Sequence, residues 1–368
     1  MIRVLHVVFE MNRGGMESRT MDLYRHIDRD KIQFDFLENT SSEAAYDEEI
    51  LSLGGKIFRS GYSRKSIFKA LRYVKKFFKE HQEYKIVHIH ESHLPSFNMA
   101  VFYYAKKYGN RKVILHSRNS NGPHIGLHRF FKERYSSRAD YHFACSEKAA
   151  MWMFDKKTLK NKNYIVINNA IDAGKFSYSA DIRNDIRKEL GLADTDIVLG
   201  HVGRFFQQKN HTFLIDIFKS LYSENHNYKL ILVGNGLLQN DIIRKVEDMG
   251  LQQAVKFLGV RKDMERIYQA FDIFLLPSLY EGLPGVGVEA QAAGLISLFS
   301  DTITDEVMIV PELCEMLPID SGVEKWCKAV NKRVETINAR RNTFEDLCEA
   351  GFDVNKMAEK LMILYNRM

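Results

Sequence analysis

Short apolar runs rich in β-branched residues alternate with segments of helical periodicity along the whole chain. This alternation is typical of parallel sheets whose strands are joined by crossover helices. We therefore predict an α/β protein. The expected strands are 3–9, 32–37, 86–89, 112–115, 141–145 and 163–168 in the first half, and 196–202, 229–233, 254–258, 272–276 and 295–299 in the second.

A polar stretch at residues 168–180 separates the two series of strands. A chain of 368 residues is long enough for two domains of about 150 residues each. We expect two Rossmann-like domains, one at residues 1–172 and one at residues 173–352. Residues 353–368 are expected to form a packed C-terminal helix, because Met357, Leu361 and Leu364 recur at helical spacing.

Composition limits the compartment and the partners. The four cysteines, at positions 145, 314, 327 and 348, form no CxxC pair, which favours a reducing, cytoplasmic location. No run of about 18 uninterrupted apolar residues occurs, so any membrane contact is expected to be peripheral. The net charge of +6 is uneven: residues 1–180 carry 31 Lys and Arg against 19 Asp and Glu (+12), and the remainder 22 against 28 (−6). The basic half suggests an anionic partner.

In open parallel sheets, ligands bind beyond the carboxyl ends of the strands, so the residues that follow each strand are the informative ones. Asn12-Arg13-Gly14-Gly15 follows the first strand and opens a predicted helix. Backbone N–H groups at such a position favour phosphate. The G-x-G-x-x-G spacing of a dinucleotide site is absent, and a tight turn without a ligand is an equal alternative.

Histidines follow two further strands of the first half. His88, His90 and His93 form the pattern H-x-H-x-x-H, which permits a zinc site. A metallohydrolase would usually carry Asp at the position of Ser92 and would need ligands from a different fold, so zinc is the minor alternative. His116 leaves its strand into a polar turn, where it could bond a substrate hydroxyl, transfer a proton, or simply cap the turn.

The second half carries the stronger pattern. The strand 196–202 runs into Gly203-Arg204-Phe205-Phe206-Gln207-Gln208-Lys209-Asn210 before a predicted helix. Arg204 and Lys209 at this position can converge on a diphosphate, with a surface ion pair as the alternative. Glu281 and Glu289 follow the strand 272–276, the first in a loop and the second on a predicted helix. Both can accept sugar or ribose hydroxyls.

Taken together, these motifs closely resemble the GT-B glycosyltransferases of family 4, especially those of bacterial exopolysaccharide and capsule biosynthesis. The resemblance spans almost the whole chain. It rests on Asn12-Arg13-Gly14-Gly15, Tyr46-Asp47-Glu48-Glu49-Ile50, His116-Ser117, Gly203-Arg204, Lys209-Asn210, Val233-Gly234-Asn235-Gly236, Phe257-Leu258-Gly259, and Pro277 through Pro284 to Glu289. It implies the GT-B fold, with two Rossmann-like domains facing across a cleft and the C-terminal helix returning to the N-terminal domain.

The resemblance also implies roles for individual residues. The catalytic group would comprise Arg204, Lys209, Glu281 and His116: the two cations neutralise the diphosphate of a nucleotide sugar, and Glu281 and His116 contact the donor sugar. Donor binding would further involve Gly15, Gly203, Asn210, Gly234, Gly259, Val260, Gly282, Leu283, Gly285 and Glu289. The N-terminal domain would receive the acceptor, and the C-terminal domain would hold the nucleotide sugar.

The expected reaction is transfer from a nucleoside diphosphate donor, UDP-linked by expectation, to a lipid-linked polysaccharide precursor. The E-x7-E pattern resembles retaining enzymes, and we assign no protein nucleophile. No D-x-D follows a strand of the second half, so we expect no metal and no other cofactor. A sugar-nucleotide 2-epimerase and a non-catalytic nucleotide- or glycan-binding subunit stay open as alternatives. Gly285 and Gly287 stand where many relatives carry bulkier residues, which would loosen the helix start or admit a differently shaped sugar.

A basic segment marks a possible membrane contact. Residues 64–79 are predicted to form a helix with an apolar stripe of Ile67, Leu71, Val74 and Phe78. The opposite face carries Lys65, Lys69, Arg72, Lys76 and Lys79. This face suits an anionic inner leaflet at about 1 kcal/mol per basic residue, and an ordinary solvated face is the alternative. No nucleic-acid motif accompanies it, so nucleic acid is not expected.

Overall fold

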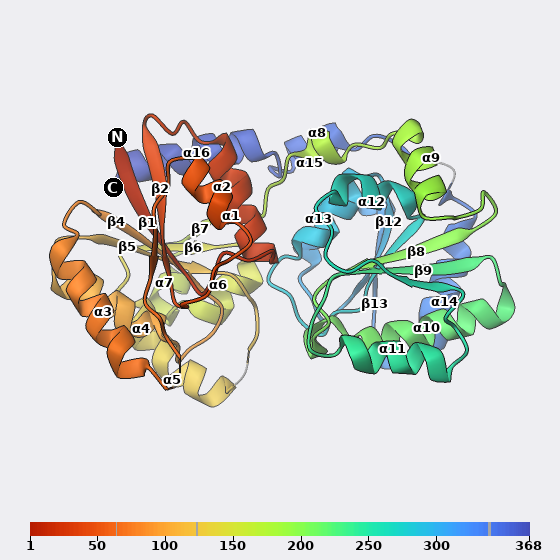
Figure 1. Cartoon of the computed structure of the whole chain (residues 1–368), viewed down its shortest axis with the longest axis horizontal. Coiled ribbons are helices and arrows are strands. Elements are labelled where there is room, and N and C mark those ends of the chain that lie inside the picture. The colour runs from red at the N-terminus through yellow and green to blue at the C-terminus, as the bar shows by residue number, and fades with distance from the viewer. Residues whose placement is uncertain (64, 123, 338–339) are drawn as a thin grey trace. The chain divides into compact units, whose positions relative to one another are not determined.

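The computed structural model describes residues 1–368 except 64, 123 and 338–339. The chain divides into two compact units (Figure 1). The first contains residues Met1–Ala170 and Val354–Met368, and the second contains Ile171–Asp353. Within the described residues, no helix combines the length and the apolar character needed to cross a membrane.

The first unit is built on a parallel sheet with the strand order β3-β2-β1-β4-β5-β6-β7. Its strands are β1 (Ile2–Val8), β2 (Ile32–Glu38), β3 (Ile57–Arg59), β4 (Ile86–Glu91), β5 (Lys112–Ser117), β6 (Tyr141–Ala144) and β7 (Ile165–Val166). Its helices are α1 (Gly15–His26), α2 (Asp47–Ser52), α3 (Ile67–Glu80), α4 (Asn98–Lys107), α5 (Ile125–Ser136), α6 (Glu147–Met153), α7 (Lys156–Lys160) and α16 (Val354–Asn366). The central strands are buried along nearly their whole length, as strands covered on both faces are.

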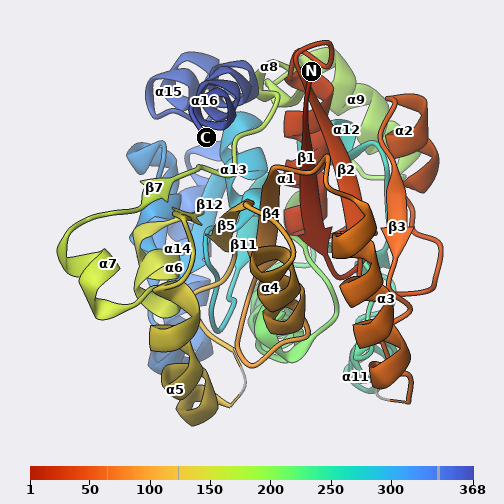
Figure 2. The same cartoon turned by 90° about the vertical axis from the view of Figure 1, so that its left-hand side faces the viewer.

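The C-terminal helix α16 belongs to this first unit, where it packs against α1. Its buried side chains include Met357 and Leu361, at the spacing that the sequence predicted. Tyr365, also buried, reaches the middle of the sheet, where its hydroxyl lies 2.6 Å from His88 Nδ1. In both views α3, α4 and α5 lie in the lower part of this unit, away from α1 and α16 (Figures 1 and 2).

The second unit has a parallel sheet with the order β10-β9-β8-β11-β12-β13. Its strands are β8 (Ile197–Val202), β9 (Tyr228–Val233), β10 (Val255–Phe257), β11 (Ile273–Leu276), β12 (Ile296–Ser300) and β13 (Cys314–Leu317). Its helices are α8 (Ala173–Phe176), α9 (Ala180–Glu189), α10 (His211–Glu224), α11 (Gln239–Asp248), α12 (Met264–Ala270), α13 (Gly285–Ala292), α14 (Gly322–Val334) and α15 (Phe344–Glu349). In both units the order reverses beside the first strand, β1 or β8, as in Rossmann-like sheets.

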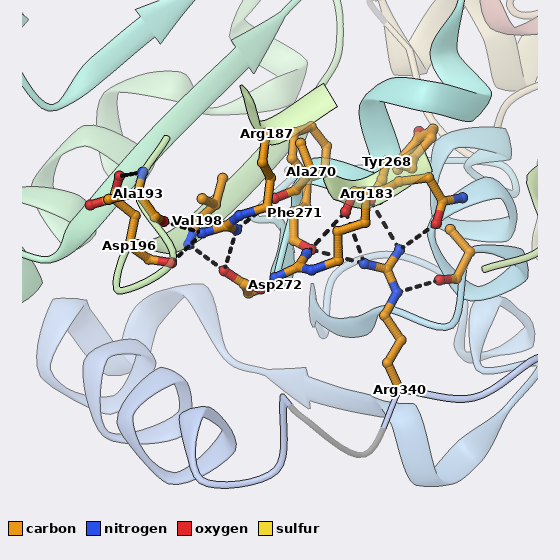
Figure 3. A network of polar contacts seen from close by, with 12 residues as sticks. Arg183, Arg187, Ala193, Asp196, Val198, Tyr268, Ala270, Phe271, Asp272 and Arg340 are labelled. Carbon is orange, nitrogen blue, oxygen red and sulfur yellow. Dashed lines mark hydrogen bonds and ion pairs between the residues drawn. The ribbon is translucent and has the colours of Figure 1, made fainter. Parts of the chain in front are cut away.

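An arginine network fastens the segments around the start of β11 (Figure 3). Asp272 pairs with Arg183 at 2.5 Å and with Arg187 at 3.3 Å, and it accepts the Val198 N–H at 2.7 Å. Arg340 is partly buried and donates to backbone carbonyls, among them Phe271 O at 3.0 Å. Burial lowers the pKa of Arg340 to about 9, so it stays charged near neutral pH. The network lies at the amino end of β11, and the predicted site residues Glu281 and Glu289 follow its carboxyl end.

Two edge strands, β3 and β13, were not predicted. β3 has only three residues and ends in Arg59, and β13 contains Glu315, so neither shows an apolar run. Helix α3 begins at Ile67, and Arg64, which the prediction included, lies outside the described residues. The predicted stripe is partly wrong: Ala70, Val74, Phe77 and Phe78 are buried, whereas Ile67 is 38% exposed.

Candidate active site

The loop after β8 is fixed to the loop after β11 by two neighbouring residues. Gln208 accepts the Leu279 N–H at 2.8 Å through its backbone oxygen and donates to the Tyr280 carbonyl at 2.8 Å through Nε2. Lys209 Nζ donates to Glu281 Oε1 at 2.7 Å. The Lys209 and Glu281 side chains are only 14% and 12% exposed, so the pair is held in a partly desolvated place. The sequence placed both residues at the carboxyl ends of strands, and the structure brings them together.

Arg204 lies at the same strand end but is exposed, and its guanidinium makes no hydrogen bond or ion pair with the described residues. Gly203, before it, packs on Lys209: a Cβ at Gly203 would lie 3.0 Å from Lys209 Cδ and Cε. A larger residue at 203 would therefore displace the lysine stem. Asn210 has a φ of 54° and precedes α10, so it turns the chain from the loop into the helix.

Glu289 lies on α13 and is 7% exposed. Tyr268, from α12, donates its hydroxyl to Glu289 Oε2 at 2.9 Å and lies 3.2 Å from the Val286 carbonyl. The hydrogen bond from Tyr268 orients the Glu289 carboxylate. The sequence had identified Glu289 but not Tyr268. Leu283, in the loop before α13, is buried, and Gly285 is the first residue of that helix.

The expectation that Gly287 loosens the helix start is not supported by its surroundings. A Cβ at Gly287 would lie 2.9 Å from Val307 Cγ2 and 3.0 Å from Phe299 Cε1. The missing side chain therefore lets α13 pack closely against β12 and the Val307 segment. Glycine at 287 therefore serves packing.

Glycines bring the ends of β8, β9 and β10 close together. Gly234 has a φ of +132°, and a Cβ there would lie 2.2 Å from the Gly203 carbonyl oxygen. The Gly234 N–H donates to the Gly259 carbonyl at 2.8 Å. Gly259 has a φ of +62°, and Val260 after it is 48% exposed. Predicted residues from three strand ends thus form one continuous backbone surface.

In the first unit, Gly15 is the first residue of α1, and Gly14 is the N-cap without a side-chain hydrogen bond. A Cβ at Gly15 would meet no atom within 4 Å, so packing does not require glycine there. The first N–H groups of an α-helix have no partner within the helix, and the N-terminus of this 12-residue helix therefore suits an anionic group.

Four histidines of the first unit form a stacked cluster with hydrogen bonds between rings. His6, His88, His90 and His116 lie on neighbouring strands, with His6 opposite His88 and His90 opposite His116. Adjacent rings stack, for example His88 on His90 with centroids 4.5 Å apart and planes at 11°. The predicted H-x-H-x-x-H group is wrong in its third member, because His6 joins His88 and His90 and His93 does not.

This cluster is poorly suited to zinc. Stacked rings direct their lone pairs into parallel planes, whereas a tetrahedral site needs lone pairs that converge on one point. A cation already occupies one edge, since Arg118 Nε donates to His90 Nδ1 at 3.0 Å. Burial lowers the pKa of His6 to about 3 and the pKa values of His88, His90 and His116 well below the ordinary value, so all four rings are neutral near pH 7.

Two more buried histidines, His201 and His211, were not predicted. His201 Nδ1 donates to the Leu275 carbonyl at 2.8 Å, and its Nε2 has no partner among the described residues. His211 stacks on Phe205, with centroids 4.1 Å apart. Burial lowers the pKa of His201 to about 3 and that of His211 to about 2. In the sequence, only proximity to Lys209 marks these two histidines. Nothing local marks Gln208 and Tyr268, because their partners Tyr280 and Glu289 lie 72 and 21 residues away.

Two Rossmann-like units with this strand order define the GT-B fold. The family pattern described as Glycosyltransferase Family 4 matches residues 13–175, and the pattern described as Glycosyl transferases group 1 matches residues 182–336. The chain is 32% identical over 375 residues to EpsF of Bacillus subtilis (strain 168), a protein named as a glycosyltransferase, covering 99% of this chain and 96% of EpsF. The chain therefore belongs to the family 4 glycosyltransferases.

Other relatives agree with this assignment. The capsular polysaccharide biosynthesis glycosyltransferase CapH of Staphylococcus aureus is 25% identical, with 99% of each chain covered. An Escherichia coli UDP-Gal:α-D-GlcNAc-diphosphoundecaprenol α-1,3-galactosyltransferase is 30% identical over 54% of this chain and 53% of its own. The crystal structure of Anabaena HepE with UDP and glucose shares the fold, with a TM-score of 0.81, 18% identity and full coverage of both chains.

Proposed function

We propose that this chain is a retaining glycosyltransferase that transfers a sugar from a UDP-linked donor to a lipid-linked polysaccharide precursor, in exopolysaccharide or capsule biosynthesis. The names of CapH and the E. coli galactosyltransferase support the pathway class, the donor and the lipid-linked acceptor. HepE, solved with UDP and glucose, supports the donor. The observation that carries the proposal is the Lys209–Glu281 pair, held by Gln208 close to the carboxyl ends of β8 and β11.

The proposed donor site uses charge at both ends of the breaking bond. Transfer leaves negative charge on the departing diphosphate and positive charge on the sugar ring. Lys209, held beside Glu281, and the exposed Arg204 stabilise the diphosphate, and these two cations replace a metal ion in the proposed reaction. Glu281, beside Lys209, accepts sugar hydroxyls and faces the developing positive charge.

The remaining donor contacts are proposed from carboxylate and backbone groups. Glu289, oriented by Tyr268, accepts ribose hydroxyls. The backbone surface of Gly203, Gly234, Gly259 and Val260 holds the diphosphate and the base. The predicted contributions of Asn210, Gly282, Leu283 and Gly285 complete this set. In the first unit, Gly15 presents helix N–H groups to the diphosphate and His116 contacts the sugar.

The acceptor is proposed to be reached from an anionic membrane surface. Lys65, Lys69, Arg72, Lys76 and Lys79 are all exposed on or just before α3. Phe68, on the same helix, is 81% exposed, so an aromatic ring accompanies the charges. Helix α5 adds Leu127 and Phe130, which are 51% and 66% exposed. Basic residues with exposed apolar side chains are the composition of a peripheral membrane contact.

Vesicle sedimentation tests the membrane contact. A variant with Lys65, Lys69 and Lys76 changed to Glu should lose binding to phosphatidylglycerol vesicles. The matched control reverses Lys156, Lys157 and Lys160, three exposed lysines of the same unit on or beside α7, with the same change of six charges. Equal sedimentation of the two variants would reject the α3 surface.

A donor screen with product analysis tests the enzymatic proposal. The wild-type protein, a panel of nucleotide sugars and membrane extract should yield a glycosylated lipid product with retained anomeric configuration. Lys209→Ala and Glu281→Ala should each lower turnover at least about 100-fold. Lys328→Ala and Glu324→Ala, which break the exposed Lys328–Glu324 pair on α14 of the same unit, should not.

The two alternatives give different results in the same assay. A 2-epimerase would convert the donor sugar without any acceptor, and a non-catalytic subunit would bind nucleotide without turnover. Near wild-type transfer by both the Lys209 and the Glu281 variant would contradict the site assignment.

A further inference from the structure

Three side chains form a hydrogen-bonded series, or hydrogen-bond chain, from the C-terminal helix to His116. Tyr365, on α16, places its hydroxyl 2.6 Å from His88 Nδ1. His88 Nε2 lies 2.8 Å from His116 Nδ1. His116 Nε2 is buried and has no partner among the described residues. All three side chains are at most 2% exposed, so no bulk water competes for these contacts.

The direction of this chain follows from its end groups. If Tyr365 donates to His88 Nδ1, the neutral His88 carries its proton on Nε2 and donates it to His116 Nδ1. His116 then carries its own proton on Nε2. In the reverse direction the tyrosine oxygen would accept, and its buried O–H would need another acceptor. The described residues provide none. The first direction leaves one buried group without a partner, the His116 Nε2–H, whereas the reverse leaves two, the Tyr365 O–H and the His116 Nε2 lone pair, and each such group costs about 1–3 kcal/mol.

A parallel chain in the same cluster shows that tautomers here are set by a neighbour. Burial lowers the pKa of Arg118 to about 10, so its guanidinium is protonated at neutral pH and can only donate. His90 Nδ1 therefore accepts from Arg118 Nε at 3.0 Å, which leaves the proton of neutral His90 on Nε2. His90 then donates to His6 Nδ1 at 2.9 Å. Both chains consist of stacked imidazoles with fixed donor and acceptor ends.

Packing holds the Tyr365 ring where this bond requires it. Phe34 meets Tyr365 edge-on, with centroids 6.0 Å apart and planes at 87°. Phe143 meets both His88 and His116 edge-on, at 5.6 Å and 5.9 Å. The rings of the chain thus have little freedom to reorient, and a change of hydrogen-bond direction requires a change of tautomer.

We propose that Tyr365 is a positioning residue that acts through His88 to fix His116 as the Nε2–H tautomer, so that His116 donates a hydrogen bond to an oxygen of the nucleotide sugar and does not serve as a base. This inference rests on the proposed function for the identity of the ligand. The tautomer itself does not depend on that function. A donor fixed in advance meets an acceptor oxygen of the ligand without reorganisation.

Nitrogen-15 NMR of the histidine side chains measures the tautomer directly. In wild-type protein the His116 signals, assigned by their loss in His116→Gln, should show the Nε2–H pattern. In Tyr365→Phe the donor to His88 is lost while the ring is kept, and His116 should shift to a mixture that includes Nδ1–H. The matched control is Tyr24→Phe, which removes another buried tyrosine hydroxyl of the same unit, bonded to Gln33 Oε1 at 3.0 Å and the Leu53 carbonyl at 3.2 Å. It should leave His116 unchanged.

Kinetics then show whether the tautomer matters for transfer. Tyr365→Phe should lower kcat/KM for the nucleotide sugar about tenfold more than Tyr24→Phe does. An Nδ1–H pattern in the wild type, or an unchanged pattern in Tyr365→Phe, would overturn the proposal whatever the activity. A shifted tautomer with unchanged kcat/KM would overturn the link to the sugar. If the wild type transferred no sugar, the proposed function would fail, and the NMR result would still decide whether Tyr365 controls His116.

Discussion

Replacement of Gly234 tests the close approach of strand ends in the second unit. In Gly234→Ala, the new Cβ would lie 2.2 Å from the Gly203 carbonyl oxygen at a φ of +132°. Strained backbone costs about 1–3 kcal/mol, and overpacking about 1–3 kcal/mol more. We therefore expect a loss of about 4 kcal/mol, which lowers Tm by roughly 8–16 °C for a unit of this size.

The assay is urea and thermal unfolding followed by the fluorescence of Trp326, which is fully buried in the second unit. A Trp152→Phe background removes the other tryptophan. The control is Gly191→Ala, at a φ of +61° with no atom within 4 Å of the added Cβ. It should cost only about 1–2 kcal/mol. Equal losses in the two variants would refute the close approach at Gly234, and with it the continuous backbone surface.

Three further predictions concern substitutions of single buried residues. Tyr268→Phe removes the donor to Glu289 and should raise the KM for the nucleotide sugar about tenfold in steady-state assays; an unchanged KM would contradict the orienting role. Burial raises the folded-state pKa of Glu91 to about 7, while the unfolded carboxyl titrates near 4.5, so the wild type should lose stability as pH rises between these values. In urea titrations from pH 4.5 to 7, the unfolding free energy of Glu91→Gln should therefore rise relative to that of the wild type by up to about 3 kcal/mol. A difference that does not change with pH would contradict this. Asp272→Asn leaves Arg183 and Arg187 without their carboxylate and should lower the unfolding free energy, measured by urea titration, by about 3 kcal/mol. A loss under about 1 kcal/mol would show that the network is dispensable for stability.

Most of the fold could be predicted from the sequence because buried parallel strands are continuous apolar runs. All eleven predicted strand positions carry strands, since each run is bounded by polar or glycine-rich turns. The two edge strands could not be predicted in the same way. β3 and β13 are short and partly exposed, so their pairing is decided by the neighbouring strand and not by their own composition.

Residues of the candidate site could be predicted where they lie in the loop that follows a strand. Lys209 and Glu281 were identified for this reason, but their contact spans 72 residues and depends on Gln208, which no local pattern marks. The histidine cluster shows the same limit. His6 is the third residue from the end of the first strand, and only the pairing of β1 with β4 brings it to His88 and His90.

Gly287 shows a packing role that the sequence does not indicate. The residue is small where many relatives are expected to be larger, but the space it leaves is taken by Phe299 and Val307. The sequence left a loosened helix start or a differently shaped sugar as explanations, because it carries no information on which side of α13 faces the sheet.

The most direct test of the donor site is calorimetric titration of nucleoside diphosphates into the wild-type protein and Lys209→Met, with Lys328→Met as the control from the same unit. UDP should bind more tightly than GDP or ADP, and Lys209→Met should weaken UDP binding at least about tenfold while Lys328→Met binds as the wild type does. If Lys209→Met bound UDP with wild-type affinity, or if no nucleoside diphosphate bound to the wild type, the diphosphate site at Lys209 would be contradicted.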